Sequence, residues 1–153
     1  MSNNLIAITS DRFSDKLINK AIESCQTNKN NLIILIVNDS SRINKTAESF
    51  KTLSPLGMTS SKHIRESLAQ HSRFLIEEDI QEIKNKAKEA GIECQEVRID
   101  GSFTEKVFEM ANKYSPENLF VCRMNVKSSF SRFLYGSAVE NLKENCNCNV
   151  VIV

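Results

Sequence analysis

The sequence has no tryptophan and contains only two prolines, four glycines and two histidines among its 153 residues. Because glycine and proline interrupt regular structure, their scarcity predicts long helices and strands. Lysine and arginine exceed aspartate and glutamate by only 20 to 19, which disfavours a broad nucleic-acid surface. No apolar run is long enough to span a membrane, and the N-terminal run lacks the basic flank of a signal peptide. We therefore expect a single cytoplasmic domain over residues 1–153, with neither nucleic acid nor membrane as a partner.

The motifs of common catalytic sites are also missing. The sequence contains no G-x-x-x-x-G-K-[ST], no G-x-G-x-x-G after its first apolar run and no G-x-S-x-G,. Its histidines, His63 and His71, fall in one predicted helix, and Cys146 and Cys148 have no nearby ligands to complete a metal site,. The remaining cysteines lie in apolar runs and are expected to be reduced core residues: Cys25, Cys94 and Cys122,. We predict no catalytic residue and no metal.

Five apolar runs have the length of strands and alternate with helical periods. The runs are Leu5–Thr9, Leu32–Val37, Ile92–Ile99, Leu119–Cys122 and Val150–Val153. The helical periods cover Asp11–Cys25 and Ser61–Ala90, and two potential capping boxes, Ser102 with Glu105 and Ser137 with Glu140, begin two further helices,. The second run is continuously apolar, as in a parallel strand buried on both faces. The pattern predicts a doubly wound, Rossmann-like α/β fold with strand order 3-2-1-4-5 and helices on both faces.

A site in this fold is expected beyond the first and fourth strands, where the strand order reverses. Thr9 and Asp11 follow the first strand, and Arg123 follows the fourth. No acidic residue occurs from Asn118 to Val139, and Gly136 and Ser137 begin the last helix. This segment is either a phosphate or carboxylate site at a helix N-terminus or a solvated basic loop with an ordinary serine cap. The irregular segment Asn38–Ser60 is either a lid or an insertion.

The segment Leu119–Val153 resembles the C-terminal signature of the universal stress protein family, and the resemblance extends over most of the chain. Members of that family that bind adenine nucleotide carry G-x-x-G, nine residues and then G-[ST]. Gly136 and Ser137 match the final pair here, but the first two glycine positions fall on Arg123 and Val126. The family's acidic residue after the first strand falls on Thr9, and Asp11 could replace it only with a shift of two residues.

The resemblance implies a non-catalytic protein of the stress response with a regulatory binding role, an unidentified protein partner and weak or lost nucleotide binding. The alternative is a protein that binds ATP or AMP, with the phosphates at the Arg123–Ser137 loop. The candidate binding residues are Thr9, Asp11, Val37, Arg123, Gly136 and Ser137. The uncharged strand Val150–Val153 at the sheet edge predicts a homodimer, because an uncovered apolar edge promotes aggregation.

Overall fold

The computed structural model describes residues 2–9, 12–38, 76–123 and 138–153, and these residues form a parallel five-stranded sheet. The strands are β1 (Asn3–Ile8), β2 (Asn31–Asn38), β3 (Cys94–Asp100), β4 (Asn118–Val121) and β5 (Asn149–Ile152). Their order across the sheet is β3-β2-β1-β4-β5, and each neighbouring pair is parallel. The predicted fold class and strand order are confirmed. The order reverses between β1 and β4, so their carboxyl ends mark the switch point of the sheet.

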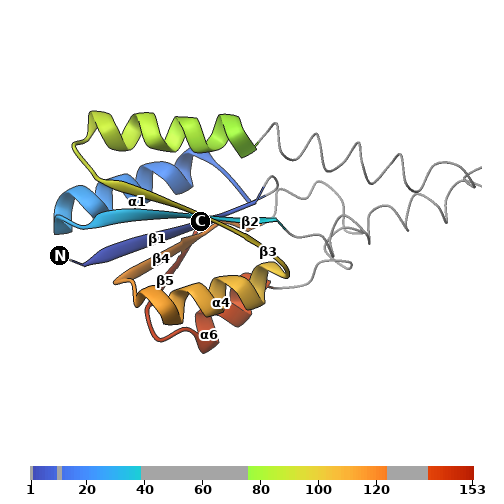
Figure 1. Ribbon diagram of the computed structural model, residues 1–153. Helices are drawn as coiled ribbons and strands as arrows, with labels where there is room; N and C mark the ends of the chain where they lie inside the picture. The colour runs from blue at the N-terminus through green and yellow to red at the C-terminus, as the bar shows by residue number, and fades with distance from the viewer. Residues whose placement is uncertain (1, 10–11, 39–75, 124–137) are drawn as a thin grey trace, which may run out of the picture.

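Helices cover both faces of the sheet (Figure 1). One face carries α1 (Asp15–Asn28) and the helix of residues 76–89, and the other carries α4 (Phe103–Tyr114) and α6 (Ala138–Asn145). Strand β2 is continuously apolar from Leu32 to Val37 because its alternate side chains enter two cores: Ile34 packs on the α1 side and Leu35 on the α4 side. The reason given for its continuous apolar run is thereby confirmed.

The helix of residues 76–89 has the phase that its sequence predicts. Ile76, Ile80, Ile83 and Ala87 recur at helical spacing, and all four are buried,. Ile76, Ile80 and Ile83 pack in the same core cluster as Ile34 of β2. The expected beginning of this helix at Ser61 and the irregular segment Asn38–Ser60 fall outside the described residues, apart from Asn38.

Two predicted features of the helix starts differ from the structure: the first residue of one helix and the side-chain cap of another. The first helix begins at Asp15 rather than Asp11, because the Ser14 side chain caps it by accepting a hydrogen bond from the Leu17 N–H at 3.1 Å,. Helix α4 has Ser102 at its N-cap position, but that side chain makes no capping hydrogen bond. The capping box predicted there is therefore not formed.

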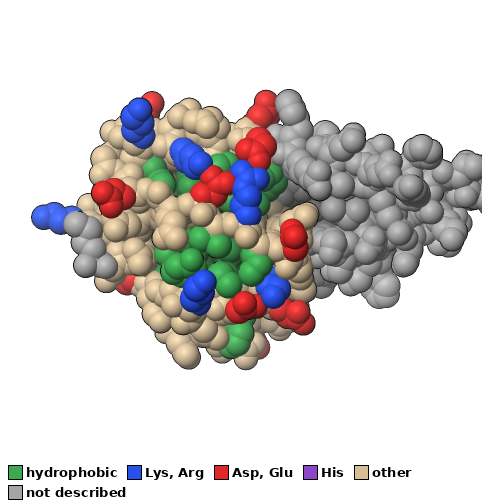
Figure 2. Space-filling view, viewed as in Figure 1, with side chains coloured by type: hydrophobic (Ala, Val, Ile, Leu, Met, Phe, Trp, Pro, Cys, Tyr) green, Lys and Arg blue, Asp and Glu red, His purple; other side chains and the backbone are tan. Residues whose placement is uncertain are grey.

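Strand β3 forms one edge of the sheet, with Val97 and Ile99 packed on the α4 side and ion pairs formed by the alternate residues. Arg98 of β3 pairs with Glu77 and Glu96, and Glu96 also pairs with Lys84 of the neighbouring helix. Figure 2 shows acidic and basic side chains gathered over this side of the molecule. Cys94 begins the edge strand and is exposed, so its predicted place in the core is wrong, whereas Cys25 and Cys122 are buried. Interspersed charges on an edge strand oppose strand addition there.

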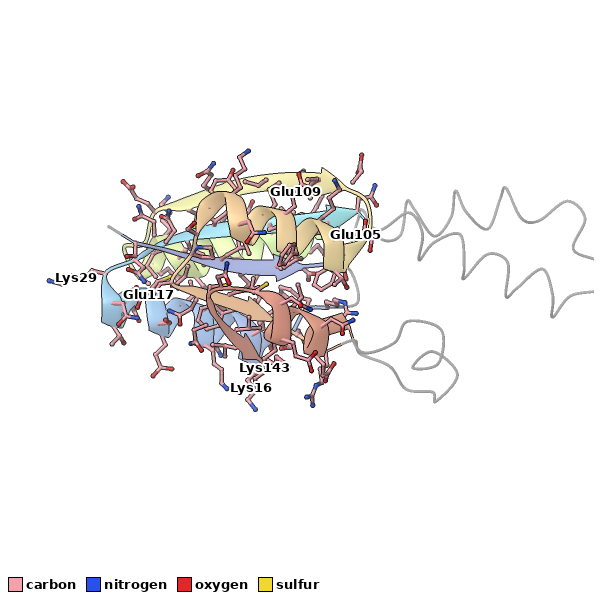
Figure 3. All side chains as sticks on the ribbon, turned by 90° about the horizontal axis from the view of Figure 1, so that it is seen from below. Lys16, Lys29, Glu105, Glu109, Glu117 and Lys143 are labelled. Carbon is pink, nitrogen blue, oxygen red and sulfur yellow. The ribbon has the colours of Figure 1, made fainter. Side chains whose placement is uncertain are left out.

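The amino ends of the strands are joined by a ladder of asparagines, which we define as Asn4, Asn118 and Asn149 with Asn30 beside them. These residues are aligned on β1, β4 and β5: Asn4 is opposite Asn118, and Asn118 is opposite Asn149. Asn149 Nδ2 donates to Asn118 Oδ1 at 2.8 Å, and Asn118 Nδ2 donates to Asn4 Oδ1 at 3.0 Å. Asn30 Nδ2 lies 3.2 Å from Asn4 Oδ1 and 2.8 Å from a carboxylate oxygen of Glu117, which is labelled at this end of the molecule in Figure 3. The ladder satisfies polar groups that would otherwise be buried at a cost.

Candidate functional site

The carboxyl ends of β1 and β4 meet where the site was predicted. Thr9 follows β1 directly, is buried, and forms an isolated antiparallel bridge with Arg12. Its carbonyl oxygen accepts a hydrogen bond from the Arg12 N–H at 3.1 Å. This Thr9–Arg12 turn brings Arg12 beside the end of β1, shortly before Ser14 caps α1. The turn therefore places the Arg12 side chain, rather than only Thr9, at the switch point.

Arg12 is the charged group at the centre of this site. Only 6% of the residue is exposed, and its Nη1 donates to the carbonyl oxygen of Cys122, just beyond β4, at 3.2 Å. Its guanidinium carbon lies 4.5 Å from the centroid of the Phe103 ring, within the range of a cation–π contact,. Phe103 is the first residue of α4. One side chain thus connects the segment after β1 with the end of β4 and the beginning of α4.

Arg123 lies beside this centre and has an acidic partner. Its Nη2 is 3.1 Å from a carboxylate oxygen of Glu140, and the two side chains are 66% and 44% exposed. Glu140 is in the first turn of α6. The absence of acid from Asn118 to Val139 therefore does not leave Arg123 unpaired, because a carboxylate just past that stretch reaches it. A carboxylate in this position also competes with any anion for the same cation and the same helix end.

The remaining predicted site residues are divided between the core and the undescribed parts of the chain. Val37, near the carboxyl end of β2, is 2% exposed and belongs to the core on the α4 side, together with Phe103. Asp11, Gly136 and Ser137 lie outside the described residues. Of the six predicted residues, Thr9 and Arg123 therefore lie at the ends of the two strands that border the switch point. Val37 lies in the core, in the same cluster as Phe103.

Comparison with known families matches residues 1–153 to the model of the universal stress protein family. The chain belongs to the universal stress protein family. No curated relative matches it at a significant level. The family resemblance inferred from the sequence is confirmed.

Solved universal stress proteins share the fold. Universal stress protein UspA from Lactobacillus plantarum is 14% identical with a TM-score of 0.68, covering 99% of this chain and 97% of that one. A universal stress protein solved in complex with cAMP is 17% identical with a TM-score of 0.61, covering 99% and 96%. One from Archaeoglobus fulgidus, solved in complex with dAMP, is 11% identical with a TM-score of 0.61, covering 99% and 97%. At these identities the likeness establishes the fold.

The sequence reasoning missed both Arg12 and Glu140 in this universal stress protein. Ser14 was the available signal for Arg12: a serine directly before a helical segment is a typical N-cap, and the residues before it then belong to the strand–helix connection,. Glu140 was assigned to a capping box with Ser137, and its contact with Arg123 spans 17 residues. No local pattern specifies that contact.

The cysteine pair at the start of β5 is unsuited to neutral-pH thiolate chemistry. Burial, with Cys148 nearby as a second cause, raises the pKa of Cys146 to about 11, and burial also raises the pKa of Cys148. Both thiols stay protonated at pH 7, and a protonated thiol is a poor nucleophile and metal ligand. Among the described residues, no group of three or more His, Cys, Asp or Glu side chains could hold a metal ion.

A groove of about 360 Å³ lies away from the switch point, between α1 and the strands β4 and β5. Lys20, Glu23 and Ser24 of α1 form one wall, and Phe120 and Val151 contribute apolar surface. The groove exists because α1 packs over β1 and its neighbours, while Val151 on the outer strand is only partly buried.

No helix in the described part of the chain is both long and apolar enough to cross a membrane.

Proposed function

We propose that this universal stress protein is a non-catalytic, cytoplasmic regulatory protein of the stress response, which acts as a homodimer by binding a protein partner. Its affinity for adenine nucleotide is weak or lost. The observation that carries the proposal is the state of the switch point: Arg12 occupies it, and Arg123 is paired with Glu140. Arg12 is buried and bonded to a backbone carbonyl, and the exposed Arg123 already has a carboxylate partner that a phosphate group would have to displace.

The sequence of the phosphate loop supports the same proposal. The nucleotide-binding pattern places glycines where this chain has Arg123 and Val126. If those positions require left-handed backbone, a residue with a side chain costs about 1–2 kcal/mol, and a β-branched one is least tolerated. Loss of two charge-assisted contacts removes about 3–6 kcal/mol. A micromolar ligand would then bind in roughly the millimolar range.

The edge strand β5 supports the dimer. Val150, Val151 and Ile152 are half-buried and uncharged, and they have β4 on one side only. Antiparallel pairing with the same strand of a second molecule about a two-fold axis would satisfy the free backbone groups and close the assembly at two. The opposite edge, β3, carries its own ion pairs and is not suited to this role.

The alternative function is binding of ATP or AMP, with the phosphates at Gly136 and Ser137. What favours it is that structural neighbours of this chain were solved in complex with cAMP and with dAMP. In this case Arg123 would have to leave Glu140 and turn toward the phosphates.

Nucleotide carried through purification separates the two functions. The protein is denatured, and the supernatant is examined by mass spectrometry for ATP and AMP. We expect neither nucleotide, and calorimetric titration with either one, with and without magnesium, should give at most millimolar binding. Release of AMP or ATP in near-stoichiometric amount would overturn the proposal in favour of the alternative.

A further inference from the structure

We propose that the Arg12 side chain fills the ligand crevice at the carboxyl ends of β1 and β4. It would thereby be the specificity-determining residue that keeps adenine nucleotides out. This inference rests on the proposed function and names a cause for it. In a doubly wound sheet, ligands enter at the carboxyl ends of the strands where the order reverses, which here is between β1 and β4,. The Arg12 guanidinium lies there, bound to the carbonyl of Cys122 at the end of β4.

The position of Arg12 is fixed from three directions. Its backbone N–H bonds to the Thr9 carbonyl, its Nη1 bonds to the Cys122 carbonyl, and its guanidinium lies over the Phe103 ring. Thr9 and Cys122 are themselves buried at the ends of β1 and β4. A long side chain anchored at its backbone, its tip and its planar face does not swing aside without breaking all of the side-chain contacts. Arg12 therefore belongs to the packed interior and does not act as a mobile surface cation.

The contacts that Arg12 makes are those that an adenine base would need. A planar base binds by stacking on an aromatic or apolar face and by donating its amino hydrogens to acceptors at the strand ends. The planar guanidinium uses the ring face of Phe103 and donates to the Cys122 carbonyl. A base entering this crevice would have to displace the guanidinium from both, and would leave a cation without those contacts in a buried place.

The same contacts disfavour Arg12 as a receptor for phosphate. One end of its guanidinium is committed to a backbone carbonyl and its face is committed to an aromatic ring. The first turns of the adjoining helices carry Glu105 in α4 and Glu140 in α6. Figure 3 shows Glu105 at the end of α4 that faces the carboxyl ends of the strands. Both helix starts at this end of the sheet therefore already carry a carboxylate, which opposes the approach of an anion.

The test compares Arg12→Ala with the wild type and with Lys16→Ala, a matched control. Lys16 is an exposed cation on α1 four residues along the chain, so its removal changes the net charge equally without opening the crevice. AMP and ATP are titrated into each protein and followed by calorimetry and amide chemical shifts. We expect Arg12→Ala to bind AMP at least about tenfold more tightly than the wild type, with shifts at Phe103 and Cys122. Lys16→Ala should behave as the wild type does.

A second variant keeps the test decisive if Arg12→Ala does not fold. Arg12→Gln removes the charge and the guanidinium over the Phe103 ring while keeping a polar side chain of intermediate length, and thermal unfolding shows which variants are folded. A gain of AMP binding in either folded variant supports the proposal. Unchanged or weaker binding in the folded variants overturns it, and weaker binding would make Arg12 an anion ligand.

The outcomes also separate this inference from the proposed function. If wild type and both variants bind no nucleotide, only the role of Arg12 is overturned. If the wild type itself binds AMP at micromolar concentration, the proposed function and the role of Arg12 are both overturned, because the arginine then excludes nothing.

Discussion

At the scale of single residues, the buried polar side chains in the described part of the chain fall into two groups at opposite ends of the sheet. The amino ends hold the neutral asparagine ladder, in which Asn4 is fully buried and joins four partners through its amide. The carboxyl ends hold Arg12, a cation with an aromatic neighbour. Amides at one end stabilise the strand register, whereas the guanidinium at the other end fills the place where ligands enter this fold. The two ends therefore differ in what substitution should do.

Replacing Asn4 with alanine should lower the free energy of unfolding by about 2–4 kcal/mol. The change removes acceptors for Asn30 and Asn118 and leaves their buried amides with fewer partners,. Asn149→Ala is the matched control, because Asn149 is exposed and donates a single bond at the end of the same ladder. Urea unfolding measures both variants. Equal losses in the two would show that the ladder contributes no more at its buried centre than at its exposed end.

At the scale of elements, burial follows each helix's position over the sheet. The helix of residues 76–89 covers the β2 side with one apolar stripe and exposes its other faces, while α1 covers β1 and leaves the groove beside β5. Strand β3 is protected by ion pairs, and β5 has no charge to protect it. The ion pairs on β3 oppose the addition of a further strand at that edge, whereas the uncharged β5 would accept one.

Truncation of the buried stripe should destabilise the domain. Ile83 is completely buried in the core with α1, so Ile83→Ala should cost about 2–5 kcal/mol through lost burial and the cavity that remains,. Lys88→Ala on the exposed face of the same helix should change stability by less than about 0.5 kcal/mol,. Chemical denaturation compares them. A loss below about 1 kcal/mol at Ile83 would contradict the packing of this helix.

At the scale of the whole molecule, the proposed homodimer would form at β5, next to the groove between this strand and α1. Val151 faces the α1 side at the groove, and Val150 and Ile152 pack toward α6. A second copy added along β5 would lie next to both surfaces. The proposed homodimer therefore predicts that a charge on this strand acts on assembly more strongly than a charge on α1.

Val151→Lys should dissociate the proposed dimer, because it would bury a charge without a partner in the strand pair. Light scattering should give about twice the mass of one chain for the wild type and the mass of one chain for the variant. Gln26→Lys, on an exposed position of α1, is the control and should remain dimeric. Circular dichroism distinguishes dissociation from unfolding. A wild type of single-chain mass would refute the pairing through β5.

The sequence by itself determined the parallel sheet, its strand order, the buried stripe of residues 76–89 and the family, because these follow from local periodicity and from motifs contiguous in the chain. It also predicted a site that includes Thr9 and Arg123, and these residues lie at the ends of β1 and β4 because the strand ends are fixed once the order is known,. Only the tertiary structure decided that Arg12 fills the crevice, that Glu140 pairs with Arg123 and that four asparagines form a ladder. The Arg12 contact with Cys122 joins residues 110 positions apart, and that of Asn118 with Asn4 joins residues 114 apart. Such contacts depend on which side chains the folded sheet brings together, and no local pattern encodes that meeting.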